Sequence, residues 1–401
     1  MNNIDGGCKE VEMKEICIGM IGAGRASELH VHALQRVHNV PIRLKTIMAR
    51  RKEQLENAKQ QYGFEQISYS FEEVLQDPEI NVIDICTPPY CHADMIMKAI
   101  EAGKHVICEK PLTGYFGDEA SKNIGLSVPK EQMYQNVMQD LDKLKKVLSE
   151  SDKKFMYAEN FVYAPSIVKA AEIVRAKKSR ILFMKGEESL KGSSSRVAGE
   201  WNKTGGGTFI RTGTHPLTAI LWLKEQEARA HGKNIYVESV MADMAMVTPS
   251  LSEYEHRHIA ARPKDVEDIG VVILSFSDQS KATIMATDTL LGGSKNYVEL
   301  YCNDTAINCT LTMNNMMDTY LLDEDGMNDV YLSEMLPSKL GWNRPFIMDE
   351  MARGYIDEMQ DFMESVYFDR EPRSGFGLAY DTTRIVYAAY AAAESGRRVV
   401  L

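Results

Sequence analysis

In the stretch Lys104-His105-Val106-Ile107-Cys108-Glu109-Lys110-Pro111, a strand-like apolar run delivers a lysine to its carboxyl end. An earlier stretch, Ile16-Cys17-Ile18-Gly19-Met20-Ile21, is also almost wholly apolar and runs into the turn Gly22-Ala23-Gly24. Such short apolar runs are typical of parallel strands buried on both faces. A glycine turn inside a series of alternating strands and helices predicts a dinucleotide site, with Lys110 as a charged catalytic candidate beside it.

The segment after the glycine turn favours phosphate binding. Its apolar residues recur at helical spacing from Leu29 to Val37. Gly22 and Gly24 would let the backbone approach a pyrophosphate at the amino end of this helix, where unpaired amides face the anion. The third glycine position of the motif holds Ser27. We expect cofactor contacts from the turn and the helix start, namely Gly22, Gly24, Arg25 and Ala26.

The alternation of strands and helices continues to residue 158. Strands are expected at 42–49, 66–69, 82–86 and 104–108, with helices between them, and the fourth strand ends at Thr87-Pro88. Apolar residues on one helical face between 133 and 148, followed by the strand-like run 154–158, predict a sixth unit. The sequence therefore predicts a doubly wound parallel sheet, the Rossmann fold, over residues 1–158.

The end of the second strand bears on the choice of cofactor. An acid there binds the ribose of NAD, whereas an arginine can hold the extra phosphate of NADP. Arg50 and Arg51 stand at this position and no acid does. They favour NADP slightly, while charges that only solvate a helix start would leave NAD as the cofactor.

Composition bounds the class of protein. The chain has 401 residues, 44% of them hydrophobic and 26% charged, which predicts two globular domains. The net charge of -11 argues against nucleic-acid or membrane partners. Seven cysteines, an odd number, fit a reducing, cytoplasmic setting. We find neither a signal-peptide-like start nor a run of about 20 apolar residues.

The pattern changes over residues 159–401. Strand-like runs follow one another at 181–186, 235–247, 269–276, 281–287, 297–301 and 319–322. Successive strands with turn signals between them predict a largely antiparallel sheet with helices on one face. Its open face would serve as a subunit contact in a homo-oligomer.

A glycine-rich loop, residues 205–213, precedes His215 at the start of an apolar helix. Taken alone, His215 could simply cap that helix. Beside Lys110 on a dinucleotide fold it becomes a candidate base, because oxidation of a hydroxyl needs a group that accepts a proton near neutral pH.

These motifs resemble those of the Gfo/Idh/MocA oxidoreductases in order and spacing over most of the chain. The resemblance rests on the glycine turn with His30, Thr87-Pro88 with His92, and residues 102–106 leading to Glu109-Lys110-Pro111. It implies a nicotinamide cofactor, bound by Thr87, Pro88, His92, Glu109 and Lys110 among others. It also implies an open-sheet second domain and a carbohydrate or polyol held between the domains.

In the family, the lysine of the Glu-Lys-Pro motif contacts the reacting hydroxyl, which gives Lys110 that role here. His215 matches the family histidine, but the aspartate expected four residues earlier is Arg211, and Thr218 replaces a further acid. An arginine cannot be a base and would repel Lys110 or bind an anionic group. Either His215 acts as sole base, or the fold serves as a non-catalytic dinucleotide sensor.

Further candidates lie around this cleft. Residues 113–130 form an insertion that could be a lid, an arm to a neighbouring subunit or a surface loop. Two histidines at 256 and 258 lack the spacing of a metal site, so no metal is expected. The predicted substrate contacts are two hydroxyl ligands, two stacking tryptophans and the loop arginine, namely Asn160, Tyr163, Trp201, Trp342 and Arg211.

The sequence thus predicts an NAD(H)- or NADP(H)-dependent oxidoreductase acting on a secondary hydroxyl of a sugar, glycoside or polyol. Carbon 3 of a glucosyl unit is a specific expectation. A tightly bound cofactor could return its hydride within one cycle, as in redox-neutral glycosidases of this family. The alternative is the sensor.

Overall fold

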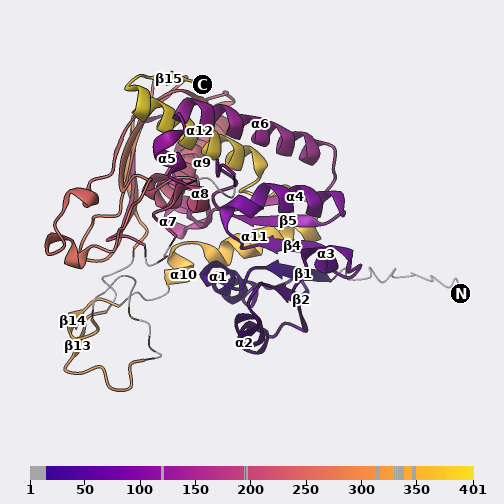
Figure 1. Ribbon diagram of the computed structural model, residues 1–401. Coiled ribbons are helices and arrows are strands. Elements are labelled where there is room, and N and C mark those ends of the chain that lie inside the picture. Colours follow the sequence, from indigo (N-terminus) through magenta and orange to yellow (C-terminus); the bar gives the residue numbers. More distant parts are fainter. Residues whose placement is uncertain are drawn as a thin grey trace, which may run out of the picture.

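The computed structural model describes residues 15–401 except 119–121, 194, 196, 313–316, 329, 331, 333–337 and 346–348. Its first sheet has six parallel strands, which confirms the predicted doubly wound fold (Figure 1). The sheet lies in the order β3 (Gln66–Ser68), β2 (Ile42–Met48), β1 (Ile16–Ile21), β4 (Val82–Ile85), β5 (His105–Glu109) and β6 (Phe155–Ala158).

Helices connect these strands. Strand β1 is buried along its whole length, as its apolar sequence predicts for a central parallel strand. The connecting elements are α1 (Arg25–Leu34), α2 (Lys52–Tyr62), α3 (Phe71–Gln76), η1 (Pro89–Cys91), α4 (His92–Glu101), α5 (Ile124–Ser127) and α6 (Lys130–Ser149).

The second sheet has seven strands and is mostly antiparallel, as predicted; only β7 and β10 pair in parallel. The expected strand at 319–322 does not join it. That segment forms a separate hairpin of β13 (Thr319–Leu321) with β14 (Gly341–Asn343). The sheet order is β12 (Ala306–Thr310), β11 (Lys295–Cys302), β7 (Ile181–Ser189), β10 (Lys281–Thr287), β9 (Ile269–Phe276), β8 (Val237–Ala245) and β15 (Val399–Val400).

Helices cover one face of this second sheet, and α9 and α12 contact β7 and β8. The other face leaves apolar side chains exposed, among them Leu182 on β7, Met241 on β8 and Ile273 on β9. The helical elements of this half are η2 (Asn160–Tyr163), α7 (Pro165–Lys177), α8 (Trp201–Thr204), η3 (Phe209–Gly213), α9 (Thr214–His231), η4 (Thr248–Ser250), η5 (Glu255–His258), α10 (Asp349–Ala352), α11 (Tyr355–Tyr367) and α12 (Phe376–Ser395).

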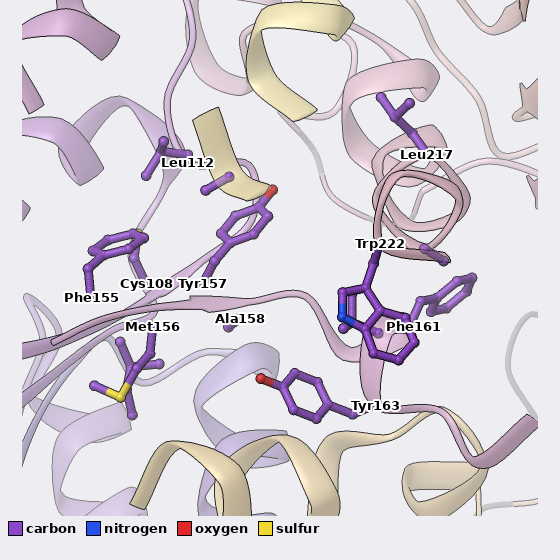
Figure 2. Packing of buried hydrophobic residues seen from close by; sticks show 14 of the residues in the cluster. Cys108, Leu112, Phe155, Met156, Tyr157, Ala158, Phe161, Tyr163, Leu217 and Trp222 are labelled. Atoms are coloured by element: carbon purple, nitrogen blue, oxygen red, sulfur yellow. The ribbon is translucent and has the colours of Figure 1, made fainter. Parts of the chain in front are cut away.

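The two sheets share one buried core. Helix α11 packs on α1, and α12 packs on α6, so the end of the chain returns to the first sheet (Figure 1). Where the chain leaves β6 for η2, the buried side chains of Tyr157, Phe161 and Tyr163 follow one another closely (Figure 2). The boundary after Ala158 therefore separates the sheets but not all the helices.

The described part of the insertion at 113–130 packs against the second half of its own chain. Tyr115 accepts a hydrogen bond from the indole of Trp201 and donates its amide to Tyr387. The amide of Gly125 donates to Asp265. These contacts fasten the described part of the segment to its own chain, and the three interpretations stay predictions; residues 119–121 lie outside the described part.

None of the described helices is both long and apolar enough to cross a membrane. The described cysteines, six of the seven, are all free thiols. The start of the chain, residues 1–14, lies outside the described residues.

Candidate active site between the two sheets

A cavity of about 780 Å³ opens where the carboxyl ends of the first sheet face the second. Helix starts, strand ends and the glycine-rich loop all contribute to its lining. The side chains that bear on chemistry are Arg25, Lys110, Glu188, Arg211, His215 and Tyr355. The structure thus brings Lys110 and His215 to one cavity, as the sequence predicts.

The glycine turn fits a dinucleotide. Gly22 has φ of +119°, and a Cβ there would lie 2.4 Å from the carbonyl oxygen of Cys86, so only glycine fits between β1 and β4. Gly24 precedes α1, and a Cβ there would meet nothing within 4 Å. Ser27, in the third glycine position, accepts the amide of Gly24 through its hydroxyl at 3.2 Å. Open space before a helix start with free amides suits a pyrophosphate.

Other predicted cofactor contacts divide into two groups. Pro88 lines the cavity beside Arg25. Arg50 and Arg51 follow β2 and are exposed, and Arg50 borders a second, polar cavity with Tyr90. The prediction that places them at the cofactor ribose stays a prediction.

His92, predicted as a cofactor contact, does not line the cavity. Its ring is fully buried, and its two nitrogens lie 2.8 Å from the Pro111 carbonyl and 2.9 Å from the Thr87 carbonyl. Burial lowers the pKa of His92 below its ordinary value. The ring lies between the loops that follow β4 and β5, and in its neutral form it donates a hydrogen bond to one of the two carbonyls.

Lys110 is held at the cavity by backbone contacts. Its ammonium donates to the Arg211 carbonyl at 2.9 Å, and its amide donates to the Glu109 carboxylate at 3.0 Å. The ammonium thereby joins the Glu-Lys-Pro motif to the glycine-rich loop across the cavity.

Behind Glu109 lies a buried charge network. The carboxylate of Glu109 is 3.2 Å from His30 Nε2, and His30 Nδ1 lies 3.0 Å from both oxygens of Asp84. Burial would lower the pKa of His30, but Asp84 and Cys86 outweigh it and raise this pKa well above the ordinary value. The ligand atoms of His30, Asp84 and Cys86 lie within 4.8 Å of one another.

His215 has the geometry of an oriented base. Its Nδ1 lies 2.6 Å from a carboxylate oxygen of the fully buried Glu159, and its ring stacks on Phe161 with centroids 4.9 Å apart. A carboxylate is an acceptor only, so Nδ1 carries the proton and Nε2 of the neutral ring keeps its lone pair. Nε2 is the ring nitrogen 3.9 Å from Glu188, which also lines the cavity.

Arg211, whose position predicts repulsion of Lys110 or binding of an anionic group, lines the cavity and is paired with an acid of the same chain. Its guanidinium forms an ion pair with Asp288, which follows β10 and is buried. Burial raises the pKa of Asp288, and the charge of Arg211 opposes this increase. The arginine charge is thus neutralised from within the chain, while its carbonyl oxygen serves Lys110.

Four predicted substrate contacts do not line the cavity. Asn160 is buried and donates to the Arg353 carbonyl, and Tyr163 is buried with its hydroxyl on Asp361 and Ser374. Trp201 is a core residue that packs on Tyr390 and donates to Tyr115. Trp342 is exposed on the β13–β14 hairpin, where it packs on Tyr320, and does not line the cavity.

Several functional candidates cannot be predicted from the sequence because they come from distant elements. Glu159, Asp288 and Tyr355 carry no sequence signal of their own. Glu188 left one recognisable sign: two successive acids, at 187 and 188, end an otherwise apolar strand-like run. An acid at the buried end of a strand needs a functional or ionic partner.

A Rossmann domain whose cavity, lined by a lysine and a histidine, meets an open-faced second sheet is typical of a class, the two-domain nicotinamide oxidoreductases. Residues 16–134 match the model of an oxidoreductase family with an NAD-binding Rossmann fold, and residues 183–308 match the Gfo/Idh/MocA carboxyl-terminal domain. The chain belongs to the Gfo/Idh/MocA family, which confirms the resemblance. The family model specifies NAD, against the slight preference for NADP drawn from Arg50 and Arg51.

Curated relatives match about a quarter of this chain. Levoglucosan dehydrogenase of Pseudarthrobacter phenanthrenivorans is 36% identical over 107 residues, 25% of this chain and 27% of that protein. The scyllo-inositol 2-dehydrogenase (NAD(+)) of Bacillus subtilis is 37% identical over 100 residues, 25% of this chain and 29% of that protein. The matching segments therefore span less than a third of these relatives.

Solved structures match the whole fold. GenD2 from gentamicin A biosynthesis, in complex with NAD, has a TM-score of 0.76 at 20% identity and covers 97% of both chains. Levoglucosan dehydrogenase in complex with NADH and levoglucosan has a TM-score of 0.71 at 18% identity, covering 96% of this chain and 99% of that one. These likenesses show a shared two-domain fold.

Proposed function

We propose that this protein is an NAD(H)-dependent dehydrogenase that transfers hydride between a secondary hydroxyl of a sugar, glycoside or polyol and the nicotinamide. One observation carries the proposal: Lys110 and His215 line the same cavity, and this cavity reaches Arg25 at the start of the helix that follows the glycine turn. The named activities of the relatives, on levoglucosan and on scyllo-inositol, support the substrate class.

The residues of the chain divide the chemistry between them. The neutral His215, held through Nδ1 by Glu159, accepts the hydroxyl proton at Nε2. The ammonium of Lys110 stabilises negative charge as it develops on the substrate oxygen, and its anchor on the Arg211 carbonyl fixes its position. When bound, the nicotinamide supplies the acceptor for the hydride.

Glu159 extends this scheme in the manner of a catalytic triad. After proton transfer the imidazolium of His215 carries a positive charge in a nearly closed environment, with only 8% of its side chain exposed. The buried carboxylate at 2.6 Å compensates that charge without itself taking the proton. His215 is therefore a sufficient base without an acid at position 211.

The finer features follow the same assignment. We propose oxidation at carbon 3 of a glucosyl unit as the first specific reaction to test, and the outer face of the seven-stranded sheet as the contact of a homo-oligomer. Leu182, Met241 and Ile273 on that face are each more than 40% exposed in the single chain, which supports such a contact.

The test is spectroscopic. Purified protein with NAD is mixed with glucosides, free sugars and inositols, and the reduced nicotinamide is followed by absorbance and fluorescence. We expect turnover with at least one class and a fall in kcat of about a thousandfold in Lys110→Ala, because the stabilising charge is lost. Cofactor binding without turnover by any compound would instead indicate the sensor. Glycoside cleavage without net NADH would indicate the redox-neutral glycosidase.

A further inference from the structure

One buried carboxylate in the cavity is not used by this scheme. Glu188 lies one residue before the end of β7, is 5% exposed, and lines the cavity together with Lys110 and His215. Among the residues that the structure describes, no hydrogen-bond donor reaches its Oε2 atom. A buried polar oxygen without a partner is costly, so its place at a ligand cavity points to a donor on the ligand.

The neighbour of Glu188 provides a contrast. Glu187 points to the other side of the sheet, where its carboxylate accepts a hydrogen bond from Ser189 at 2.8 Å and pairs with Lys295 at 2.8 Å. The Glu187 carboxylate thus has its hydrogen-bond and ion-pair partners within the chain, and Glu187 does not line the cavity. The two acids therefore differ in what they offer a ligand. Glu188 has an acceptor oxygen without a donor at the cavity, and Glu187 does not.

Burial and charge act in opposite directions on Glu188. Burial raises the pKa of Glu188 above its ordinary value, and His215, Arg353 and Lys110 oppose this increase only in part. Other groups facing this corner are Glu159, which raises the pKa, and Tyr355, which lines the cavity. The acceptor role of Glu188 therefore rests on the geometry of its Oε2 atom, which is buried at the cavity without a donor among the described residues.

The spacing of acceptors selects the ligand. Glu188 Oε2 lies 3.9 Å from His215 Nε2, too far for a hydrogen bond between them. Both atoms are acceptors when the ring is neutral with its proton on Nδ1, so each needs a separate O–H donor. A ligand with hydroxyl groups on adjacent carbons presents two such donors at a comparable spacing. A single alcohol presents one, and a carboxylate presents none.

We propose that Glu188 is the substrate-binding residue that accepts a hydrogen bond from the hydroxyl adjacent to the one facing His215, which makes the ligand of this site a vicinal diol. Glu188 thereby supplies, from β7, the substrate-facing carboxylate that the loop lacks at Arg211. This inference rests on the proposed function for the identity of the reacting hydroxyl, but the binding event itself needs no turnover.

The test measures binding, in the presence of NADH, of methyl glucoside, its 2-deoxy and 4-deoxy analogues, myo-inositol and cyclohexanol. Wild-type protein is compared with Glu188→Gln and with the matched control Glu187→Gln. We expect one of the two polyols to bind, with its Kd rising about tenfold to a hundredfold in Glu188→Gln, the range of one hydrogen bond to a charged group. Glu187→Gln should bind as the wild type does.

The deoxy analogues and cyclohexanol identify the contact. If methyl glucoside is the ligand, one deoxy analogue should bind wild-type protein weakly, and Glu188→Gln should weaken it little further. For myo-inositol, cyclohexanol takes the place of that analogue. The proposal fails if Glu188→Gln weakens binding of the diol and of the analogue equally, or if it weakens neither. It also fails if neither polyol binds to the wild-type protein.

Turnover separates this inference from the proposed function. If wild-type protein binds the diol through Glu188 but reduces no nicotinamide, the dehydrogenase proposal fails while the diol site stands. If it oxidises a sugar and Glu188→Gln leaves the Kd of diol and analogue unchanged, the dehydrogenase stands and the diol site fails.

Discussion

The cavity has two walls that are built differently. The nucleotide wall includes Arg25, Pro88 and Lys110, and the turn Gly22–Gly24 leads into it; these segments directly follow parallel strands of one sheet. The substrate wall is formed by Glu188, Arg211 and His215 with their buried partners. Its groups come from a strand end, a loop and a helix start in the second half of the chain.

The difference lies in the range of the interactions that place each group. On the nucleotide wall, the position of a side chain follows from the strand that precedes it. On the substrate wall, the His215 ring is fixed by Glu159 at the domain junction, and Arg211 is neutralised by Asp288 from another strand. Local motifs therefore place the residues of the proposed cofactor site, and long-range ion pairs place the side chains that face it across the cavity.

The largest expected effect comes from breaking the substrate wall at its base. His215→Asn should lower kcat by about a thousandfold, because removing a positioned general base costs a factor in this range. Glu159→Gln should cost about a hundredfold, since an amide can let the ring adopt the other tautomer. Steady-state rates at saturating NAD and substrate measure both.

The nucleotide wall serves as the internal control for these variants. The Kd for NADH, measured by fluorescence, should stay within about twofold of the wild-type value, because neither side chain belongs to that wall. A fall in kcat of Glu159→Gln equal to that of His215→Asn would mean that Glu159 does more than orient the ring.

The same contrast explains what could be predicted from the sequence. The parallel sheet, the glycine turn and Lys110 follow from local patterns of apolar runs and turns, and the structure bears out their arrangement. Asn160 and Tyr163 were chosen in the right segment, but the chain turns into η2 after Glu159, which directs Glu159 to His215 and buries the others. Nothing in a local pattern gives that change of direction.

Ion pairs between distant elements were equally out of reach. The sequence marks Arg211 as a charge in an unexpected place, yet its partner Asp288 lies 77 residues away. Pairing of this kind depends on the register of β7, β9 and β10, and sequence periodicity does not specify that register. The positive charge of Arg211 alone therefore did not predict that Asp288 would pair with it in the structure.

A second prediction concerns the pH dependence of the substrate wall. Glu267 is buried and accepts the amides of Gly207 and Phe209, which hold the glycine-rich loop, and the hydroxyl of Tyr390. Burial raises the pKa of Glu267 from 4.5 to about 7. A raised pKa stabilises the fold fully below pH 4.5, and this contribution is lost as the pH rises through 7.

The free energy of unfolding falls by about 3 kcal/mol, because the pKa of Glu267 rises from 4.5 to about 7 on folding. Thermal midpoints of wild type and Glu267→Gln should therefore converge between pH 5 and pH 8, since the amide does not titrate. Glu267→Gln itself lowers the midpoint at pH 5, because it replaces one acceptor by a donor. Parallel curves would show that Glu267 is ionised throughout this range.

The smallest expected effect tests the nucleotide wall by itself. At Gly24 a Cβ meets no protein atom within 4 Å and φ is -104°, which alanine adopts freely. Gly24→Ala should thus fold, at a cost of at most about 1 kcal/mol for a poorer helix cap. Its Cβ would enter the space that we assign to the pyrophosphate, so the Kd for NADH should rise about tenfold.

Gly22→Ala is the matched contrast to this variant, because its Cβ would lie 2.4 Å from a backbone oxygen at a φ of +119°. It should lose stability even without cofactor, by more than about 1 kcal/mol. The two glycines then separate two demands on one turn: Gly22 lets the strands close, and Gly24 leaves room for the ligand. An unchanged Kd for NADH in a folded Gly24→Ala variant would indicate that the pyrophosphate does not bind at this helix start. It would also remove the support for placing the nicotinamide beside Lys110.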